Sequence, residues 1–174
     1  MRVLAMLIGV VATVVAASPE RARQVDPFAP VAFLLGQWTG TIEGEPGRGT
    51  ATREYARALN DRFIRVTNRS EYPPQEKNPK GEVHHDEGFM SVDLARKRIV
   101  LRQFHVEGFV NQYVQDGDGR TVFVSEAIEN IPTGFKARET YTRIDDDHFT
   151  EVFELAEPGK PFTIYSRTAF TRVR

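Results

Sequence analysis

The chain of 174 residues contains no cysteine. This absence excludes disulfides, thiolate metal ligands, a cysteine nucleophile and the acylated cysteine of a lipoprotein. The sequence also lacks an excess of either charge, because 23 basic residues oppose 24 acidic ones and the formal net charge is -1. The basic residues are scattered among the acidic ones, so the electrostatic footprint of a nucleic-acid-binding protein is missing. We therefore expect no nucleic-acid partner.

Several catalytic signatures are absent as well. The sequence has no Gly-x-Ser-x-Gly elbow, no phosphate-binding loop, no dinucleotide fingerprint and no His-Glu-x-x-His motif. Hydrophobic residues nevertheless make up 40% of the chain and charged residues 27%, which is typical of a folded protein. The length suits one ordinary domain, and no internal boundary or repeat interrupts it.

The N-terminus has the pattern of a secretory signal peptide over residues 1–17. Arg2 precedes an apolar run over 3–15, and the small residues Ala16 and Ala17 follow it. A run of about 13 residues is shorter than the about 20 that a membrane-spanning helix needs. We therefore expect a secreted or periplasmic protein with no stable membrane span after processing. A short uncleaved anchor is the alternative.

The rest of the chain predicts an all-β domain over 33–174, preceded by an extended, proline-containing lead-in over 18–32. Short β-branched and aromatic runs alternate with turn residues, and no long helical period occurs. The runs are 34–43, 49–58, 62–72, 83–93, 97–106, 108–116, 120–129, 134–144, 147–156 and 162–173. About ten successive hairpins favour a single up-and-down antiparallel β-barrel, because closure leaves no exposed edge. A two-sheet sandwich is the alternative.

The alternation within three runs places one polar residue on each apolar face. These faces are Ile99, Leu101, Gln103 and His105; Val122, Val124, Glu126 and Ile128; and Phe149, Glu151, Phe153 and Leu155. A sealed core avoids unpaired polar groups, whereas a ligand cavity uses a few of them to orient its guest. The pattern therefore indicates either a cavity or residues near a wet barrel mouth.

The segment Phe33-Leu34-Leu35-Gly36-Gln37-Trp38-Thr39-Gly40 resembles the Gly-x-Trp opening of calycin (lipocalin-like) barrels. It is most similar to the nitrobindin-type haem-binding barrels, which are related to fatty-acid-binding-like proteins. The stretches 88–93 and 102–113 look like a bacterial branch of such barrels. This resemblance implies a ten-stranded barrel with an internal pocket. It also implies that Gly36 and Trp38 close one end, where Arg172 or Arg174 stacks on the indole.

The same resemblance makes haem a candidate cofactor. In nitrobindins a histidine of the last strand holds the iron, and Tyr165 stands nearest to that place here. The sequence departs from the family at this point, because no histidine follows His148. A tyrosinate is able to ligate haem iron, while packing is the plainer role for Tyr165.

A metal site is a second hypothesis. On a strand, His84 shares a face with Asp86, and His85 shares the other face with Glu87. Adding His105 from the next strand gives two histidines and a carboxylate, a set that suits zinc or iron. Solvated residues at the start of a strand are the alternative interpretation of His84 and His85.

Two further groups of polar residues are candidates for a pocket. His105 with Glu107 has the composition of a general base held by a carboxylate, although a buried hydrogen-bond network around Gly108 would use the same residues. Glu126 and Arg138 lie on adjacent predicted strands and could pair. If Arg138 pointed inward, it would suit a ligand carboxylate.

We therefore expect a secreted barrel that binds a small, mostly apolar molecule. The ligand-orienting candidates are His105, Asn111, Tyr113, Glu126, Arg138 and Tyr165. One alternative is a barrel hydrolase, isomerase or lyase that uses His105 with Glu107. Another is a structural or interaction protein whose barrel is filled by side chains, including its 12 phenylalanines.

Overall fold

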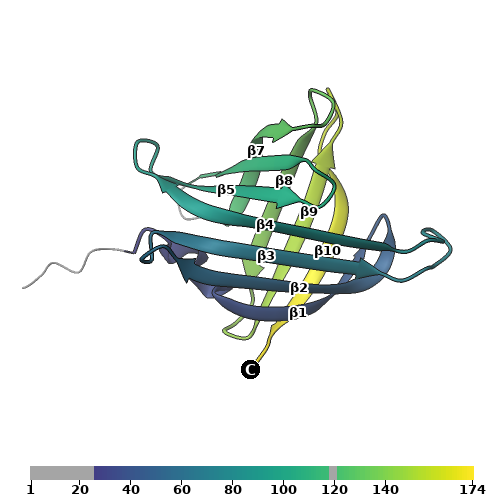
Figure 1. The fold of residues 1–174 in the computed structure, drawn as a ribbon, viewed down its shortest axis with the longest axis horizontal. Coiled ribbons are helices and arrows are strands. Elements are labelled where there is room, and N and C mark those ends of the chain that lie inside the picture. The colour runs from purple at the N-terminus through teal and green to yellow at the C-terminus, as the bar shows by residue number, and fades with distance from the viewer. Residues whose placement is uncertain (1–25, 118–120) are drawn as a thin grey trace, which may run out of the picture.

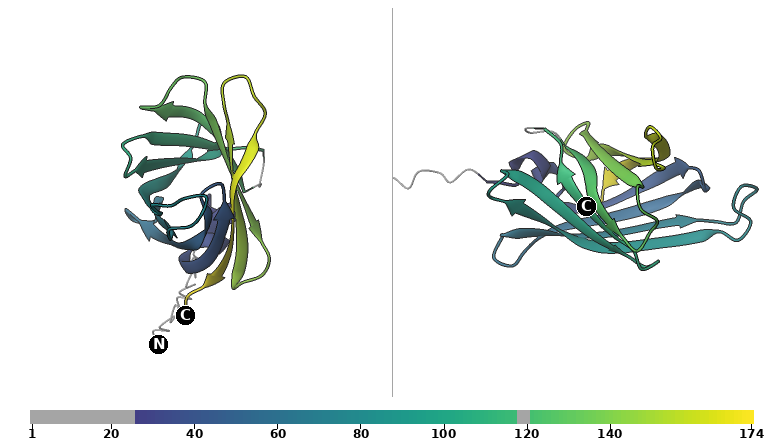
Figure 2. Two further views of the ribbon diagram at one scale, coloured as in Figure 1. Left: turned by 90° about the vertical axis from the view of Figure 1, so that its right-hand side faces the viewer. Right: turned by 90° about the horizontal axis from the view of Figure 1, so that it is seen from above.

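The computed structural model describes residues 26–117 and 121–174. Ten antiparallel strands pair in chain order, and the first also pairs with the last, so that the sheet closes into a barrel (Figures 1 and 2). The predicted all-β, up-and-down barrel of ten strands is confirmed. The expected signal peptide over 1–17 lies outside the described residues.

The strands agree with the predicted runs to within a few residues at each end. They are β1 (Gly36–Gly44), β2 (Gly47–Ala58), β3 (Phe63–Tyr72), β4 (Glu82–Asp93), β5 (Arg98–His105), β6 (Val110–Gln115), β7 (Val122–Glu129), β8 (Lys136–Arg143), β9 (His148–Ala156) and β10 (Thr163–Arg172). Turn chemistry explains the breaks between them. At the β2–β3 turn, for example, Asn60 and Asp61 adopt φ of 57° and 61°, a conformation that these residue types tolerate.

A short 3₁₀ helix, η1 (Ala29–Leu34), precedes the barrel. The extended conformation expected for 18–32 is therefore wrong from residue 29 onward. Pro30 favours the first turn of the helix, and Val31 and Leu34 are buried together with Phe28. Within 26–117 and 121–174, no helix has the length and hydropathy of a membrane span.

Aromatic side chains fill the half of the barrel next to η1. The Trp38 ring meets Phe149 edge to face, with ring centroids 4.7 Å apart. Phe149 in turn stacks on Phe170 at 4.7 Å. The indole nitrogen of Trp38 donates a 2.7 Å hydrogen bond to the carbonyl oxygen of Leu34, which satisfies its polar atom inside the core. This half of the barrel is a packed core and not a cavity.

Arg172 at the end of β10 closes this packed half. Its guanidinium carbon lies 4.0 Å from the centroid of the Trp38 ring, a cation–π contact. The same guanidinium donates to the carbonyl oxygens of Leu35 at 2.6 Å and Phe33 at 3.1 Å. Gly36 has a φ of 121°, and a Cβ there would lie 2.5 Å from an Arg172 nitrogen. Gly36, Trp38 and Arg172 thus form one closing unit, with Arg172 in the place that the calycin resemblance implies.

We expect Gly36→Ala to lower the free energy of unfolding by roughly 1–3 kcal/mol, because alanine strains this φ and its Cβ displaces Arg172. Urea unfolding measures the loss. Gly159→Ala is the matched control, since Gly159 also has a positive φ, 75°, but its Cβ would meet nothing within 4 Å. Equal losses in the two variants would show that the approach of Arg172 contributes nothing.

Candidate functional site

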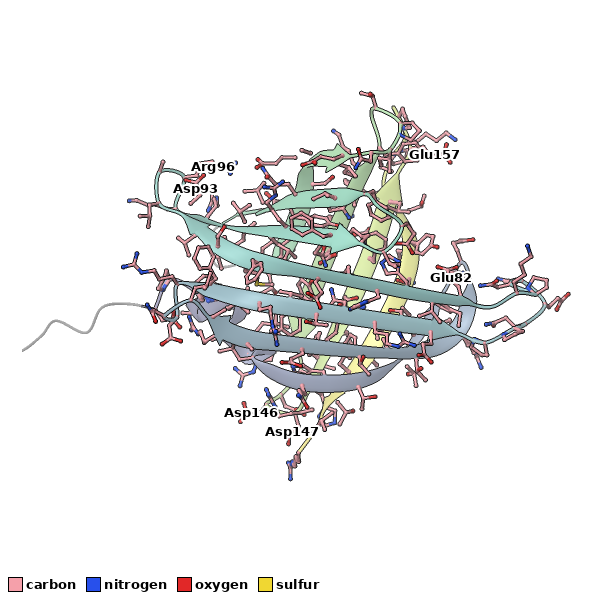
Figure 3. All side chains as sticks on the ribbon, viewed as in Figure 1. Glu82, Asp93, Arg96, Asp146, Asp147 and Glu157 are labelled. Atoms are coloured by element: carbon pink, nitrogen blue, oxygen red, sulfur yellow. The ribbon has the colours of Figure 1, made fainter. Side chains whose placement is uncertain are left out.

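The other half of the barrel interior holds a cavity of about 380 Å³. Its lining comes from all ten strands and from the β5–β6 and β7–β8 connections. The lining residues are Ile42, Arg53, Asn68, Ser70, Tyr72, Glu82, His84, Asp86, Gln103, His105, Glu107, Phe109, Asn111, Tyr113, Ile128, Ile131, Phe135, Ala137, Glu139, Glu151, Phe153, Leu155, Tyr165 and Ser166. Figure 3 shows Glu82 at the start of β4, on the side of the molecule away from Asp93 and Arg96.

A buried ion pair forms the floor of the cavity. Arg53 of β2 donates to both carboxylate oxygens of Glu151 of β9, at 2.8 and 3.2 Å. Their side chains are only 7% and 9% exposed. The remaining Arg53 nitrogen donates to the backbone oxygens of Thr52 and Arg69, at 3.0 and 3.2 Å, and to Ser70 Oγ at 3.4 Å. Every guanidinium nitrogen of Arg53 is therefore engaged within the protein.

A third ionisable residue lies beside this pair. Glu139 of β8 is buried and accepts a hydrogen bond from the hydroxyl of Tyr141. Burial, together with the nearby negative charge of Glu151, raises the pKa of Glu139 to about 8. Glu139 is therefore mostly protonated at neutral pH, so the floor carries little net charge.

Asp86 of β4 is held in the cavity wall by two amides. Its Oδ1 accepts from Asn68 Nδ2 at 2.9 Å and from Gln103 Nε2 at 3.2 Å. Burial raises the pKa of Asp86 to about 6, against the opposing influence of Arg53. The other oxygen, Oδ2, faces two imidazoles: it lies 3.7 Å from His84 Nε2 and 4.0 Å from His105 Nδ1.

The imidazoles of His84 and His105 continue the polar wall of the cavity, which begins at Asp86 and its two amide partners. They lead toward the more exposed Glu107. His105 Nδ1 lies 3.1 Å from His84 Nε2, and His84 Nδ1 lies 2.8 Å from Glu107 Oε1. Glu107 thus bonds to His84 and not to His105, so the expected His105–Glu107 pair is replaced by a chain of three groups. Burial, followed by repulsion from His84, lowers the pKa of His105 to about 4. His105 is therefore neutral at physiological pH.

The buried amides leave acceptor oxygens unused. Among the described residues, Asn68 Oδ1, Gln103 Oε1 and Asn111 Oδ1 are buried and accept no hydrogen bond. Each belongs to a cavity-lining residue whose NH₂ group is already donating. A buried polar atom without a partner costs free energy. The buried wall therefore offers these three acceptor oxygens to a guest, while the NH₂ groups of the same amides already donate within the protein.

The structure brings four of the six expected ligand-orienting residues to the cavity. His105, Asn111 and Tyr113 lie on neighbouring parts of β5 and β6, and the amide of Asn111 donates to the Tyr113 hydroxyl at 2.8 Å. Tyr165 lies at a register shift between Ile164 and Ser166. This irregularity lets Tyr165 and its neighbour Ser166 both line the cavity.

Glu126 lies outside, contrary to the expected face of 120–129. Gln112 pairs with Ala127 and Tyr113 with Ser125, so Glu126 is the extra residue of a β-bulge. After the bulge, Ile128 faces inward as expected. Before the bulge, Phe123 is the buried residue of β7, in place of the expected Val122 and Val124. Glu126 instead accepts from Arg96 on the outer surface, at 2.6 and 3.2 Å.

Arg138 and His85 also lie on the outer surface. Ala137 and Glu139 take the inward positions of β8, so Arg138 points outward and pairs with Glu154 at 2.5 Å instead of Glu126. On β4, His84 and Asp86 take the inward positions. His85 therefore alternates to the other face and is not among the described residues that line the cavity.

The surroundings of Tyr165 do not by themselves favour the phenolate that ligation of a haem iron requires. A tyrosine ligates iron as the phenolate, which a nearby positive charge favours. Burial, followed by the negative charges of Glu82, Glu45 and Glu107, instead raises the pKa of Tyr165. We derive no haem chemistry from this side chain.

Sequence reasoning missed most of the buried charge cluster. Arg53 and Glu139 did not enter the candidate site, although Arg53 alternates with Ala51 and Tyr55 in a run whose inward face is otherwise apolar. Glu151 stood out as polar on an apolar face, but its partner did not. The sequence did carry a signal. On each of β2, β8 and β9, one charged residue (Arg53, Glu139 or Glu151) alternates with apolar residues and so shares their inward face.

No protein-family model matches the chain, and no curated protein matches it. Among solved structures, Rv2717c from M. tuberculosis is similar with a TM-score of 0.59 and 18% sequence identity, over 85% of this chain and 98% of its own. A redesigned β-barrel, mFAP0, bound to DFHBI, has a TM-score of 0.44 and 9% identity, over 80% of this chain and 99% of its own. The first likeness shows a shared barrel fold, and the second supports no inference. Membership of the nitrobindin or calycin family stays a prediction.

The raised pKa of Glu139 predicts a pH-dependent stability. The unfolded state releases the proton near the usual value of 4.5 and the folded state near 8, so stability present below pH 4.5 is lost as the pH rises through 8. Between about pH 7 and 8 we expect the free energy of unfolding to fall by about 1 kcal/mol per pH unit. Glu139→Gln should remove this slope in urea unfolding. Equal slopes in both proteins would contradict the assignment.

Proposed function

We propose that this barrel binds a small molecule with an apolar body and a head group that donates hydrogen bonds. The observation that carries this proposal is the cavity of about 380 Å³ inside the barrel, with unused acceptor oxygens in its buried wall. Cavities of this size bury most of a small ligand, and a few polar groups fix its orientation.

The opposite wall of the cavity is apolar and suits the body of such a ligand. Ile128 of β7, Ile131 and Phe135 of the β7–β8 connection, and Phe153 and Leu155 of β9 line it. Pairing between β7 and β8 covers only three residue pairs, the last of them Val124 with Arg138. The part of the apolar wall formed by Ile128, Ile131 and Phe135 therefore lies where these two strands no longer pair.

The head group is expected to be an amine or a hydroxyl and not a carboxylate. The cavity's only buried guanidinium among the described residues, that of Arg53, already donates to Glu151, Ser70 and backbone oxygens. An anion would displace those bonds and approach Glu151 and Asp86, which costs free energy in a buried site.

Isothermal titration with octan-1-ol, octylamine and octanoate tests the head-group preference, because the three share one chain. We expect the alcohol and the amine to bind one per barrel and octanoate to bind at least about tenfold more weakly, which corresponds to about 1.4 kcal/mol. Ile128→Trp should fill the cavity and abolish binding. Val124→Trp on the outward face of β7 is the control. Tighter binding of octanoate, or no saturable binding of any of the three, would refute the proposal.

We also propose that the protein is exported, on the sequence pattern over 1–17. Expression of the full chain in a bacterium, followed by cell fractionation and N-terminal sequencing, is the measurement. A periplasmic or secreted product that begins at Ser18 is expected. Retention of Met1 in the cytoplasmic fraction would contradict export.

A further inference from the structure

We propose that His84, Asp86 and His105 form a binding site for a divalent transition-metal ion in the cavity wall. One ligand atom from each residue lies within 4.8 Å of the others. The three atoms are His84 Nε2, Asp86 Oδ2 and His105 Nδ1, separated by 3.1, 3.7 and 4.0 Å. The site goes beyond the proposed function, because metal binding needs no organic ligand.

The spacing of these atoms suits a single ion. The circle through three points with these separations has a radius of about 2.1 Å, which matches Zn–N and Zn–O distances in proteins. An ion at its centre therefore reaches all three ligands without movement of the strands. The pairing of Asp86 with His105 across β4 and β5, and the alternation of His84 with Asp86 along β4, hold them in place.

The atoms behind the ligands are arranged as in metal sites. His84 Nδ1 bonds to Glu107 at 2.8 Å, which leaves Nε2 directed at the site. Carboxylates commonly hold the distal nitrogen of metal-binding histidines in this way. Asp86 Oδ1 is fixed by the amides of Asn68 and Gln103, so Oδ2 is the oxygen presented to the imidazoles.

The hydrogen bonds of Asn111 are compatible with a metal bound at His105 Nδ1. Asn111 is 3% exposed, and its Oδ1 accepts no hydrogen bond among the described residues. Its Nδ2 lies 3.2 Å from His105 Nε2 and 2.8 Å from the Tyr113 hydroxyl. When His105 Nδ1 binds a metal, Nε2 carries the proton. A half-turn of the amide then lets Oδ1 accept from both His105 and Tyr113, and moves the NH₂ group to the buried position that Oδ1 now occupies.

The ligand set selects the class of ion. Two imidazoles and one carboxylate suit Zn²⁺, Co²⁺ or Fe²⁺, whereas Mg²⁺ and Ca²⁺ prefer all-oxygen sites. All three residues line the cavity, so the ion keeps at least one coordination position open to it. A water molecule or the head group of a bound ligand would complete the coordination.

Titration of the chelator-treated protein with Zn²⁺ and Co²⁺ tests the site. We expect one ion per chain by calorimetry, visible d–d absorption with Co²⁺, and a higher melting temperature with Zn²⁺. His84→Ala and His105→Ala should abolish all three signals. His85→Ala is the matched control, because it removes the neighbouring histidine on the opposite face and should bind as the unmodified protein does. Glu107→Gln should weaken binding by about 10- to 100-fold.

Two results would overturn the metal site. One is no saturable binding by the unmodified protein. The other is equal binding by His84→Ala and His85→Ala, with circular dichroism confirming that both variants are folded. Octan-1-ol titration of the metal-free protein separates this outcome from failure of the proposed function, because that experiment depends on the cavity and not on the ion.

Discussion

A buried ion pair between Arg53 and Glu151 divides the interior of this barrel. On one side, the Arg53 guanidinium lies 5.2 Å from the ring of Phe170, which belongs to the packed aromatic half. On the other side, both residues line the cavity. Removing two charges from water is costly, and their mutual bonds, the backbone oxygens around Arg53 and the Ser70 hydroxyl offset this cost. The pair therefore fixes where the packed core ends and where the cavity begins.

The chemical character of the cavity follows from the same pair. Every guanidinium nitrogen of Arg53 already donates within the protein, so this buried positive charge is unavailable to a guest. The rest of the polar wall contains amide carbonyl, carboxylate and imidazole acceptors. Such a wall favours a hydrogen-bond donor or a cation. Both proposals above, the organic ligand and the metal ion, depend on this excess of acceptors. His84, Asp86 and His105 belong to the wall that both would contact.

The sequence predicted the site in part, and the errors have local causes. Alternation correctly placed Gln103, His105 and Glu151 inside, because β5 and β9 are regular there. It failed on β7, where the bulge at Glu126 shifts the register by one residue and reverses the face. A bulge has no strong sequence signal, so this error could not be foreseen from the residues alone. The outward position of Arg138 could, because it alternates with Ala137 and Tyr141 on a regular strand.

The number of strands, their order and the Trp38 closing unit were determined by the sequence alone, because they depend on local turn chemistry, period-two alternation and one short motif. The tertiary structure alone decided which charged side chains meet. Arg53 and Glu151 are 98 residues apart, and His84, Asp86 and His105 converge only when β4 pairs with β5. Barrel closure brings such residues into one low-dielectric space. There, burial, neighbouring charges and hydrogen-bond partners shift the pKa of each side chain away from its usual value.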